Sequence, residues 1–538
     1  MPRIGIDVGG THTDGVLIQN GKIVKKEKVL TNHDNLFSSL TDVFTRLTEN
    51  LSHSEIKKIT ISSTLTTNLI IENKLPKVGL IISGGPGIKL DYFLKDEFSF
   101  ILDGFIDHRG RVIKDINLKD IDTIINSLIA NDVHTCAVCT KFSVRNPIHE
   151  IKIKERIENF FDNVSCGHIF SGTLNFPRRI NTSYLNAGVY NTNKKFLDSI
   201  VKFLQGKNIN CPVFFLKADG GTFNINNAYE KPIFTVLSGQ AAGVTGIMSL
   251  IDINEDCAAV IDIGGTSTDF SIFVKNSPVF EPEGIKINSF LTNVRSIYTK
   301  SIGLGGDSFI RPINNNLKIG PERKGVAIVF GGNELTPTDV IFYLNGDNRP
   351  EKKLKEIADV LNISIDKLCE EILKQFCKII ENEIIEIENE LNSKPVYTIK
   401  EMVEFEEIKV KKIYLMGAPA DSFKPYIEKY LNIPVEVVPH YEVVNAIGVA
   451  VSKATSELNL FADTVVGTIS IPEYDFFEYI EKNFTLKDSY NYLEKMLQTK
   501  DFDIIEQQEF NVIKGFYTAG KTIRVKAQIK PGVEVLLK

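Results

Sequence analysis

Short apolar runs alternate along this chain with glycine-rich polar turns, and longer segments repeat apolar residues at helical spacing. Short runs bounded by Gly, Pro, Asn or Ser are typical of buried strands. They predict strands at residues 4–8, 59–62, 78–82, 135–140, 214–216, 259–261, 412–416 and 433–439. Apolar positions three and four apart predict helices within residues 36–51, 238–246, 361–391 and 445–454. Asn20-Gly21 between alternating runs predicts a hairpin over residues 14–30.

One octapeptide occurs twice, each time after an apolar run and before another. Asp7-Val-Gly-Gly-Thr-His-Thr-Asp14 recurs as Asp262-Ile-Gly-Gly-Thr-Ser-Thr-Asp269, with six of the eight positions identical. Paired glycines let the backbone turn tightly, and the amides and hydroxyls of such a turn can hold phosphate oxygens. A single copy would fit equally well as a hairpin turn with solvated threonines. Two copies far apart in the chain indicate a duplicated unit and favour a pair of phosphate loops.

Two predicted helices have a face of small residues. Because glycine costs helix stability, such a face indicates that another backbone approaches closely. The first face consists of Gly239, Ala242, Gly243 and Gly246, and the second consists of Ala446, Ala450 and Ala454. We expect the two helices to cross each other.

Several further turns lie between these elements. Residues 301–308 form a glycine-rich turn that we expect to face a cleft, and residues 417–420 form a turn of small residues after a strand. Residues 63–68 are interpreted as a hydroxyl-rich loop. Thr338 or Asp339 is the expected N-cap of the helix that follows residue 336.

Composition narrows the class of protein. The 538 residues, at about 150 per domain, predict three or four structural units. A net charge of −6 argues against a nucleic-acid partner and against a membrane-surface role. Seven scattered cysteines are typical of reduced thiols, so we expect a cytoplasmic protein. No run of about 20 apolar residues predicts a membrane span, and the early first octapeptide leaves no room for a signal peptide.

Three shorter patterns imitate functional motifs. Cys136-Ala-Val-Cys139 matches a redox or zinc motif, but a strand places the two thiols on opposite faces. Residues 515–522 match the P-loop pattern, but the alternating residues that follow predict a strand, whereas a P-loop opens a helix. His149 and Glu150 stand where a helix should begin, which is compatible with a capping role or with a place in a cleft.

In this order, the motifs resemble the actin-like ATPase superfamily and, within it, the hydantoinase A / 5-oxoprolinase family. The segments that carry the resemblance are Asp7–Asp14, Thr66–Asn68, Asn146–Glu150, Asp219–Gly221, Ser238–Gly243, Asp262–Asp269 and Thr336–Asp339. They cover most of residues 1–455. The chain departs from the family pattern at residues 61–64, at Met416-Gly417, after Gly320-Pro321-Glu322, and in a tail that is short beyond about residue 455.

The resemblance implies an α/β fold: two lobes of an actin-like ATPase, a duplicated ribonuclease H-like architecture with a cleft between the lobes. We divide the chain into an N-terminal lobe at residues 1–185, a second lobe at 186–440, and a return helix with a β-rich extension at 441–538. The resemblance also implies ATP and Mg²⁺ as cofactors. The residues expected to contact the nucleotide are Gly9, Gly10, Thr11, His12, Thr13, Gly264, Gly265, Thr266, Ser267, Thr268, Gly305, Gly306, Gly417 and Ala418.

The resemblance also implies roles for three aspartates. Asp7 and Asp262 are expected to be catalytic by orienting the nucleophile, and Asp7, Asp262 and Asp269 are expected to hold Mg²⁺ through water. The alternative is that these carboxylates accept hydrogen bonds from the amides of their own turns.

The activity implied by the resemblance is ATP-dependent hydrolysis of a cyclic amide such as a hydantoin or 5-oxoproline. Phosphorylating the amide oxygen creates a leaving group, so that water can attack a carbon that resonance otherwise protects. Two alternatives stay open: a subunit of an ATP-dependent ketone carboxylase, and a regulatory ATP-binding subunit. Members of the family often work with a hydantoinase B-like subunit, so we expect an oligomer and a partner of that kind.

Overall fold

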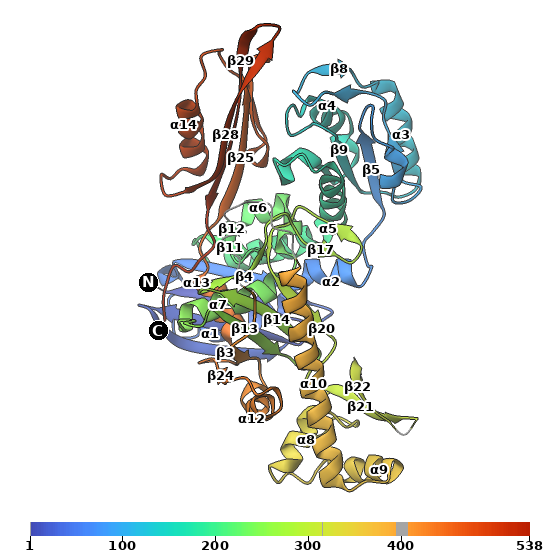
Figure 1. Ribbon diagram of the computed structural model, residues 1–538, viewed down its shortest axis with the longest axis vertical. Helices are drawn as coiled ribbons and strands as arrows, with labels where there is room; N and C mark the ends of the chain where they lie inside the picture. The colour runs from blue at the N-terminus through green and yellow to red at the C-terminus, as the bar shows by residue number, and fades with distance from the viewer. Residues whose placement is uncertain (1, 315, 394–406, 538) are drawn as a thin grey trace.

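The computed structural model describes residues 2–314, 316–393 and 407–537. Figure 1 shows a layered α/β body with two separate units above it and a group of helices below it. The body contains two six-stranded sheets. The two units above the body are an α/β unit built from early residues and a β unit built from the last residues.

The first sheet of the body has the strand order β12-β11-β4-β1-β2-β3. Its strands are β1 (Arg3–Val8), β2 (His12–Gln19), β3 (Lys22–Leu30), β4 (Lys58–Ser63), β11 (Val213–Leu216) and β12 (Thr222–Asn224). One face packs against α1 (Leu36–Leu47) and the later turns of α5 (Phe176–Gly206), in a core that includes Phe44 and Leu197. The predicted hairpin is confirmed, with Asn20 and Gly21 at positive φ between β2 and β3.

The second sheet repeats the arrangement of the first. It has the order β15-β14-β13-β23-β24, with β20 on the edge of β14. Its strands are β13 (Cys257–Ile263), β14 (Thr268–Val274), β15 (Ser277–Pro278), β20 (Thr299–Ile302), β23 (Lys412–Met416) and β24 (Val435–Val437). In both sheets the strand before the octapeptide pairs antiparallel with the strand after it and parallel with a later strand. The duplicated two-lobed fold is therefore confirmed.

Within the described residues, four helices share one hydrophobic core with the outer face of the second sheet. They are α8 (Pro337–Leu344), α9 (Glu351–Leu361), α10 (Ile365–Asn392) and α12 (Ala420–Leu431). Figure 1 shows α10 as a long helix that runs from the body to α8 and α9 at the lower end. The predicted helix within residues 361–391 is confirmed as α10.

Two short helices, α7 (Ser238–Leu250) and α13 (Val444–Val451), lie between the two sheets. They cross with almost no space between their backbones. A Cβ atom built on Gly448 would lie 1.9 Å from the carbonyl oxygen of Ala242, and one built on Gly246 would lie 2.3 Å from that of Val444. The predicted crossing is confirmed, although α13 ends at Val451, so that Ala454 lies outside it.

The upper α/β unit contains a parallel sheet with the order β10-β9-β5-β6. Its elements are β5 (Val78–Ser83), β6 (Ser99–Ile101), β9 (Thr135–Thr140), β10 (Asn163–Cys166), α3 (Leu118–Ala130) and α4 (Ile148–Ile157). Cys136 packs into the core on one face of β9 and Cys139 into the core on the other. The prediction that these thiols face opposite sides of a strand is confirmed.

The upper β unit contains a sheet with the order β27-β26-β25-β29-β28. Its elements are β25 (Ser456–Asp463), β26 (Thr468–Ile471), β27 (Phe476–Tyr479), β28 (Asp503–Lys514), β29 (Tyr517–Ile529) and α14 (Leu486–Leu497). The P-loop-like residues 515–522 form the hairpin turn and the start of β29, as predicted. After β29 the chain returns to the body, where Glu534 pairs with Lys58 at 2.9 Å and also with Arg3.

Three local expectations need correction. The loop expected at residues 63–68 is a helix from Leu65 onward, α2 (Leu65–Ile71), because the hydroxyls of this segment face buried partners. The N-cap of α8 is Thr336 rather than Thr338 or Asp339, and Asp339 instead completes the capping box. His149 and Glu150 do not cap α4, whose N-cap residue is Pro147.

The remaining short elements connect these units. They are α6 (Ile225–Glu230), β7 (Phe105–Ile106), β8 (Val112–Lys114), β16 (Phe280–Glu281), β17 (Lys286–Ile287), β18 (Phe290–Leu291), β19 (Ser296–Ile297), β21 (Ser308–Ile313) and β22 (Asn316–Arg323). The domain boundary after residue 185 stays a prediction, and that residue lies within the continuous helix α5. None of the helices described here is both long and apolar enough to cross a membrane.

Candidate nucleotide site

The two octapeptides form the same turn in the two lobes. In the first, the amide of Gly9 donates a hydrogen bond to the carbonyl of His12 over 3.1 Å; in the second, Gly264 donates to Ser267 over 2.9 Å. The first and last aspartates of each octapeptide face each other across the strand pair, so their side chains share one face. The repeated sequence therefore produces a repeated backbone geometry.

The other two predicted turns of the second lobe pack against its octapeptide. Gly306 and Asp307 donate backbone hydrogen bonds to Gly264 and Gly265, over 2.9 and 2.8 Å. Gly417 has a φ of +94°, and a Cβ atom there would lie 2.5 Å from Oδ1 of Asp262. Only glycine fits this position, which explains the Met416-Gly417 turn. Gly305, Gly306 and Gly417 are thus brought to the second loop, while Ala418 is exposed beside it.

Three carboxylates from the two lobes lie close together. The side chain of Asn445, in the first turn of α13, lies beside both Asp7 and Asp262 and lowers the pKa of each, against the larger effect of desolvation. Desolvation, with repulsion from Asp269 second, raises the pKa of Asp262 to about 7. Desolvation also raises the pKa of Asp7 and of Asp269. The two strands that precede the loops therefore end at one shared, poorly solvated place.

In the described part of the chain, the carboxylates of Asp7, Asp262 and Asp269 do not accept hydrogen bonds from the amides of their own turns. Asp269 accepts a hydrogen bond from the side chain of Gln240 over 2.9 Å. The side chains of Ser62 and Asn445 lower the pKa of Asp7, against desolvation. Oδ1 of Asp7 is buried and has no hydrogen-bond partner. A buried carboxylate oxygen without a donor can accept from the water shell of Mg²⁺, which prefers oxygen ligands. Within the described residues the three carboxylates do not converge closely enough to ligate one ion together, so they fit a divalent cation that is held through water.

Sequence reasoning missed four groups at this place. Asn445 and Gln240 lie on the two helices whose sequence pattern is dominated by small residues, so no local pattern marks their side chains as part of a site. Lys28 forms a salt bridge of 2.8 Å with Asp14. Burial lowers the pKa of His12, and the charge of Lys28 lowers it further. Arg323, 2.8 Å from Asp307, acts on His12 in the same direction. Cations from both lobes thus lie around the first loop, which suits a polyanionic ligand.

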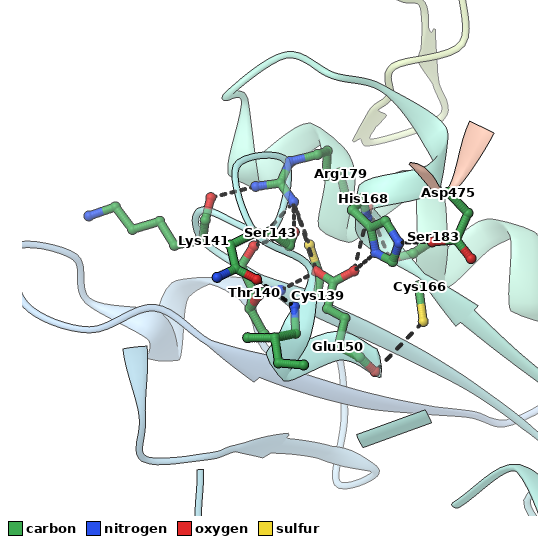
Figure 2. Close-up of polar contacts among 12 residues, drawn as sticks. Cys139, Thr140, Lys141, Ser143, Glu150, Cys166, His168, Arg179, Ser183 and Asp475 are labelled. Carbon is green, nitrogen blue, oxygen red and sulfur yellow. Dashed lines mark hydrogen bonds and ion pairs between the residues drawn. The ribbon is translucent and has the colours of Figure 1, made fainter. Parts of the chain in front are cut away.

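A second polar cluster lies in the upper α/β unit, away from the two loops (Figure 2). Glu150 is fully buried, and its carboxylate accepts from the amide of Thr140 over 2.6 Å and from the ring of His168 over 2.6 Å. The other ring nitrogen of His168 lies 2.7 Å from Asp475, which comes from the β unit. Burial opposes a charged ring, but the two carboxylates outweigh it and raise the pKa of His168. His149 and Glu150 thus belong to this cluster and its surroundings, not to the nucleotide site.

Glu150, Cys166 and His168 are close enough to suggest a metal site. Their hydrogen bonds argue against it, because both nitrogens of His168 already bond to carboxylates and have no lone pair to offer. Burial also raises the pKa of Cys166, so its thiol stays protonated. Arg179, with Nη1 4.0 Å from the carboxylate of Glu150, adds a positive charge. The cluster is a buried ion-pair network that joins two units.

Comparison with known proteins identifies the family of this chain. The family model "Hydantoinase/oxoprolinase" matches residues 179–458, and the model of its N-terminal region matches residues 3–161. The chain belongs to the hydantoinase/oxoprolinase family. The predicted resemblance is confirmed.

Two curated relatives of this hydantoinase/oxoprolinase chain have known activities. The 5-oxoprolinase of Saccharomyces cerevisiae is 27% identical over 62% of this chain and 28% of its own length. The caprolactamase subunit alpha of Pseudomonas jessenii is 24% identical over 63% of this chain and 53% of its own length. The chain spans between 28% and 61% of the length of the curated relatives compared.

The fold extends over the whole chain. The nucleotide-free structure of an acetone carboxylase, from a study of ATP-dependent acetone carboxylation, matches with a TM-score of 0.69 at 16% identity. The match covers 100% of this chain and 89% of that one. The two upper units and the lower helices are therefore part of a shared architecture.

Proposed function

We propose that this chain is the ATP-dependent subunit of an enzyme that opens a cyclic amide of the hydantoin or 5-oxoproline type. The observation that carries the proposal is the convergence of two matching loops on Asp7 and Asp262, with the side chain of Asn445 beside both. Membership of the family supports it, because relatives include a 5-oxoprolinase and a caprolactamase subunit.

The roles of the residues follow from their places. Residues 9–13 and 264–268 bind the β- and γ-phosphates from opposite lobes, and the turns at Gly305-Gly306 and Gly417-Ala418 abut the nucleotide. Asp7, Asp262 and Asp269 hold Mg²⁺, which when bound neutralises phosphate charge. Asp7 or Asp262 orients the attacking group. Fixed amides and charges at these positions stabilise the transition state without reorganising during the reaction.

The proposed reaction consumes one ATP and two waters. The amide oxygen attacks the γ-phosphorus and ADP leaves, which converts the inert amide carbon into a phosphorylated, electrophilic one. Water adds to that carbon, the ring C–N bond breaks, and the amine takes a proton. The remaining acyl phosphate is hydrolysed by a second water to carboxylate and inorganic phosphate. The chain contributes positioning and charge stabilisation to the first step.

The test is ATP hydrolysis by the purified chain with Mg²⁺ and hydantoin, 5-oxoproline or caprolactam. We expect amide-dependent turnover, and Asp262→Ala should abolish it while leaving the fold intact. Asp122→Ala, on the exposed surface of α3, is the matched control, since that residue pairs only with Arg156. Undiminished turnover in Asp262→Ala would contradict the assignment of this site.

A ketone carboxylase subunit is the second candidate, because the acetone carboxylase structure matches the whole chain. ATP turnover that requires bicarbonate and a ketone, but no amide, would favour it. The known relatives also include named subunits, which supports a multi-subunit assembly with a hydantoinase B-like partner. Turnover that appears only after such a partner is added would place the later chemistry on the partner.

A further inference from the structure

A large cavity lies away from the phosphate loops, where the two upper units meet the body. Its volume is about 840 Å³, and its walls include residues of all three parts, such as Phe170, Lys231 and Glu473. Asn224 of β12 and Asn227 of α6 also line it, and Figure 1 shows these two elements below the upper units. None of the residues expected to contact the nucleotide lines it. The cavity is therefore separate from the candidate nucleotide site.

Most acidic groups in the wall already have partners. Lys217 lies 3.2 Å from Asp219, and Glu457 pairs with Arg295 at 3.1 Å and with Lys526 at 3.0 Å. These carboxylates are neutralised within the wall and have little remaining capacity to attract a cationic ligand.

The two acids nearest the β unit are also satisfied. Glu473 accepts hydrogen bonds from the amide of Gly172 over 2.6 Å and from the side chain of Asn459 over 2.7 Å. Asp475 pairs with the buried ring of His168 over 2.7 Å (Figure 2). The remaining acids of the wall, Glu230 and Glu283, are both exposed to solvent at its rim.

The basic groups of the cavity wall are less completely paired than its acidic groups. The ammonium of Lys231 donates one hydrogen bond, to the main-chain carbonyl of Glu473 over 2.7 Å, and forms no salt bridge within the described part of the chain. Arg295 also lines the cavity, and its Nη1 donates to Glu457 over 3.1 Å. Desolvation lowers the pKa of Lys231, and the carboxylates of Glu230, Glu473 and Asp475 act in the opposite direction without offsetting it. The unused N–H groups of Lys231 cost free energy until a ligand accepts from them.

We propose that this cavity binds a small organic carboxylate, whose carboxylate group accepts hydrogen bonds from Lys231 and Arg295. Phe170, Phe234 and Leu497 line the same cavity and provide an apolar wall for the carbon chain of the ligand. An inorganic anion would leave this wall solvated, so the combination favours a carboxylate attached to a hydrocarbon chain. The product of the proposed ring opening belongs to this class, although the assignment of the cavity does not depend on that reaction.

The test measures binding of small probes to the full chain by titration calorimetry and ligand-detected NMR, with a non-hydrolysable ATP analogue present to occupy the nucleotide site. Hexanoate and 6-aminohexanoate should bind, while hexylamine and inorganic phosphate should not. Lys231→Met should weaken hexanoate binding about tenfold or more, since a charge-assisted hydrogen bond is lost. Lys202→Met, on the exposed surface of α5, is the matched control and should bind as the original chain does.

Equal binding of hexanoate and hexylamine, or no hexanoate binding at all, would overturn the proposal. So would unchanged hexanoate affinity in Lys231→Met. If that variant fails to fold, Arg295→Gln and the comparison of hexanoate with hexylamine on the unaltered chain decide the question. Because ATP turnover is not measured, failure of the proposed function and failure of this assignment give different results.

Discussion

The crossing of α7 and α13 should tolerate no added methyl group. Replacing Gly448 with alanine puts a Cβ atom 1.9 Å from the carbonyl oxygen of Ala242 and 2.6 Å from the amide nitrogen of Gly246. Both of these atoms belong to the backbone of α7, so no side-chain rotation can relieve the contact. The helices must move apart, and they are the layer that joins the two sheets.

The size of the effect follows from two opposing terms. Alanine in place of glycine within a helix gains about 1 kcal/mol of helix stability. Overpacking a tight core costs about 1–3 kcal/mol and more when the backbone must shift. We therefore expect Gly448→Ala to lose about 2 kcal/mol or more of unfolding free energy. The displacement should also weaken nucleotide binding, because Asn445 lies on the same helix and its side chain interacts with both Asp7 and Asp262.

Thermal and urea unfolding of Gly448→Ala and of the unaltered chain, followed by circular dichroism, measure the difference in stability. The control is Gly206→Ala at the end of α5, where a Cβ atom would meet nothing within 4 Å. That variant should be neutral or slightly more stable. If Gly448→Ala unfolds at the same temperature and urea concentration as the unaltered chain, the close helix contact described here is wrong.

Three further changes test other parts of the structure. Since the pKa of Asp262 rises from 3.8 to about 7 on folding, this group destabilises the fold increasingly as pH rises through that range. Asp262→Asn should therefore unfold at a higher temperature than the unaltered chain at pH 8, by a margin that is smaller at pH 5 and disappears near pH 3, as scanning calorimetry without nucleotide would reveal. The raised pKa of His168 makes its ion pairs stabilising at low pH, and this contribution is lost as pH rises through the folded-state value. Asp475→Asn should thus lower the unfolding temperature at acidic pH, with a deficit that shrinks at alkaline pH; a constant deficit would argue against the ion pair. Lys521→Ala should leave ATP turnover unchanged, because Lys521 lies 3.2 Å from Glu509 on the hairpin rather than near either loop, and a loss of turnover would reopen the P-loop interpretation.

Repetition made the nucleotide site predictable from the sequence. Neither octapeptide was decisive by itself, but their identity predicted matching turns, and the structure has the same amide-to-carbonyl bond in both. The small residues of α7 and α13 predicted the crossing for a similar reason, since few other contacts explain glycine within a helix. Local patterns also separated the strand at residues 517–529 from a true P-loop.

Contacts between distant segments were not predictable in this way. The network of Glu150, His168 and Asp475 joins residues that are 18 and 307 positions apart. No local pattern indicates which buried carboxylate will meet which ring. Asn445 was overlooked for the same reason, because its partners lie on strands near the start and the middle of the chain. The sequence did not predict that Thr336 caps α8, because Thr336, Thr338 and Asp339 lie within four positions and each has a side chain that can cap a helix.

The position of α13 has a consequence for the synthesis of the protein. β1 and β2 leave the ribosome before α7 and α13, yet one face of their sheet, including Val16 and Ile18, is covered by these two helices. Until residues 444–451 have been translated, this apolar face cannot acquire its native cover. Transiently exposed apolar surface of this kind is prone to aggregation. Completion of the first lobe must therefore wait until α13, which follows β2 by more than 400 residues, has been synthesised.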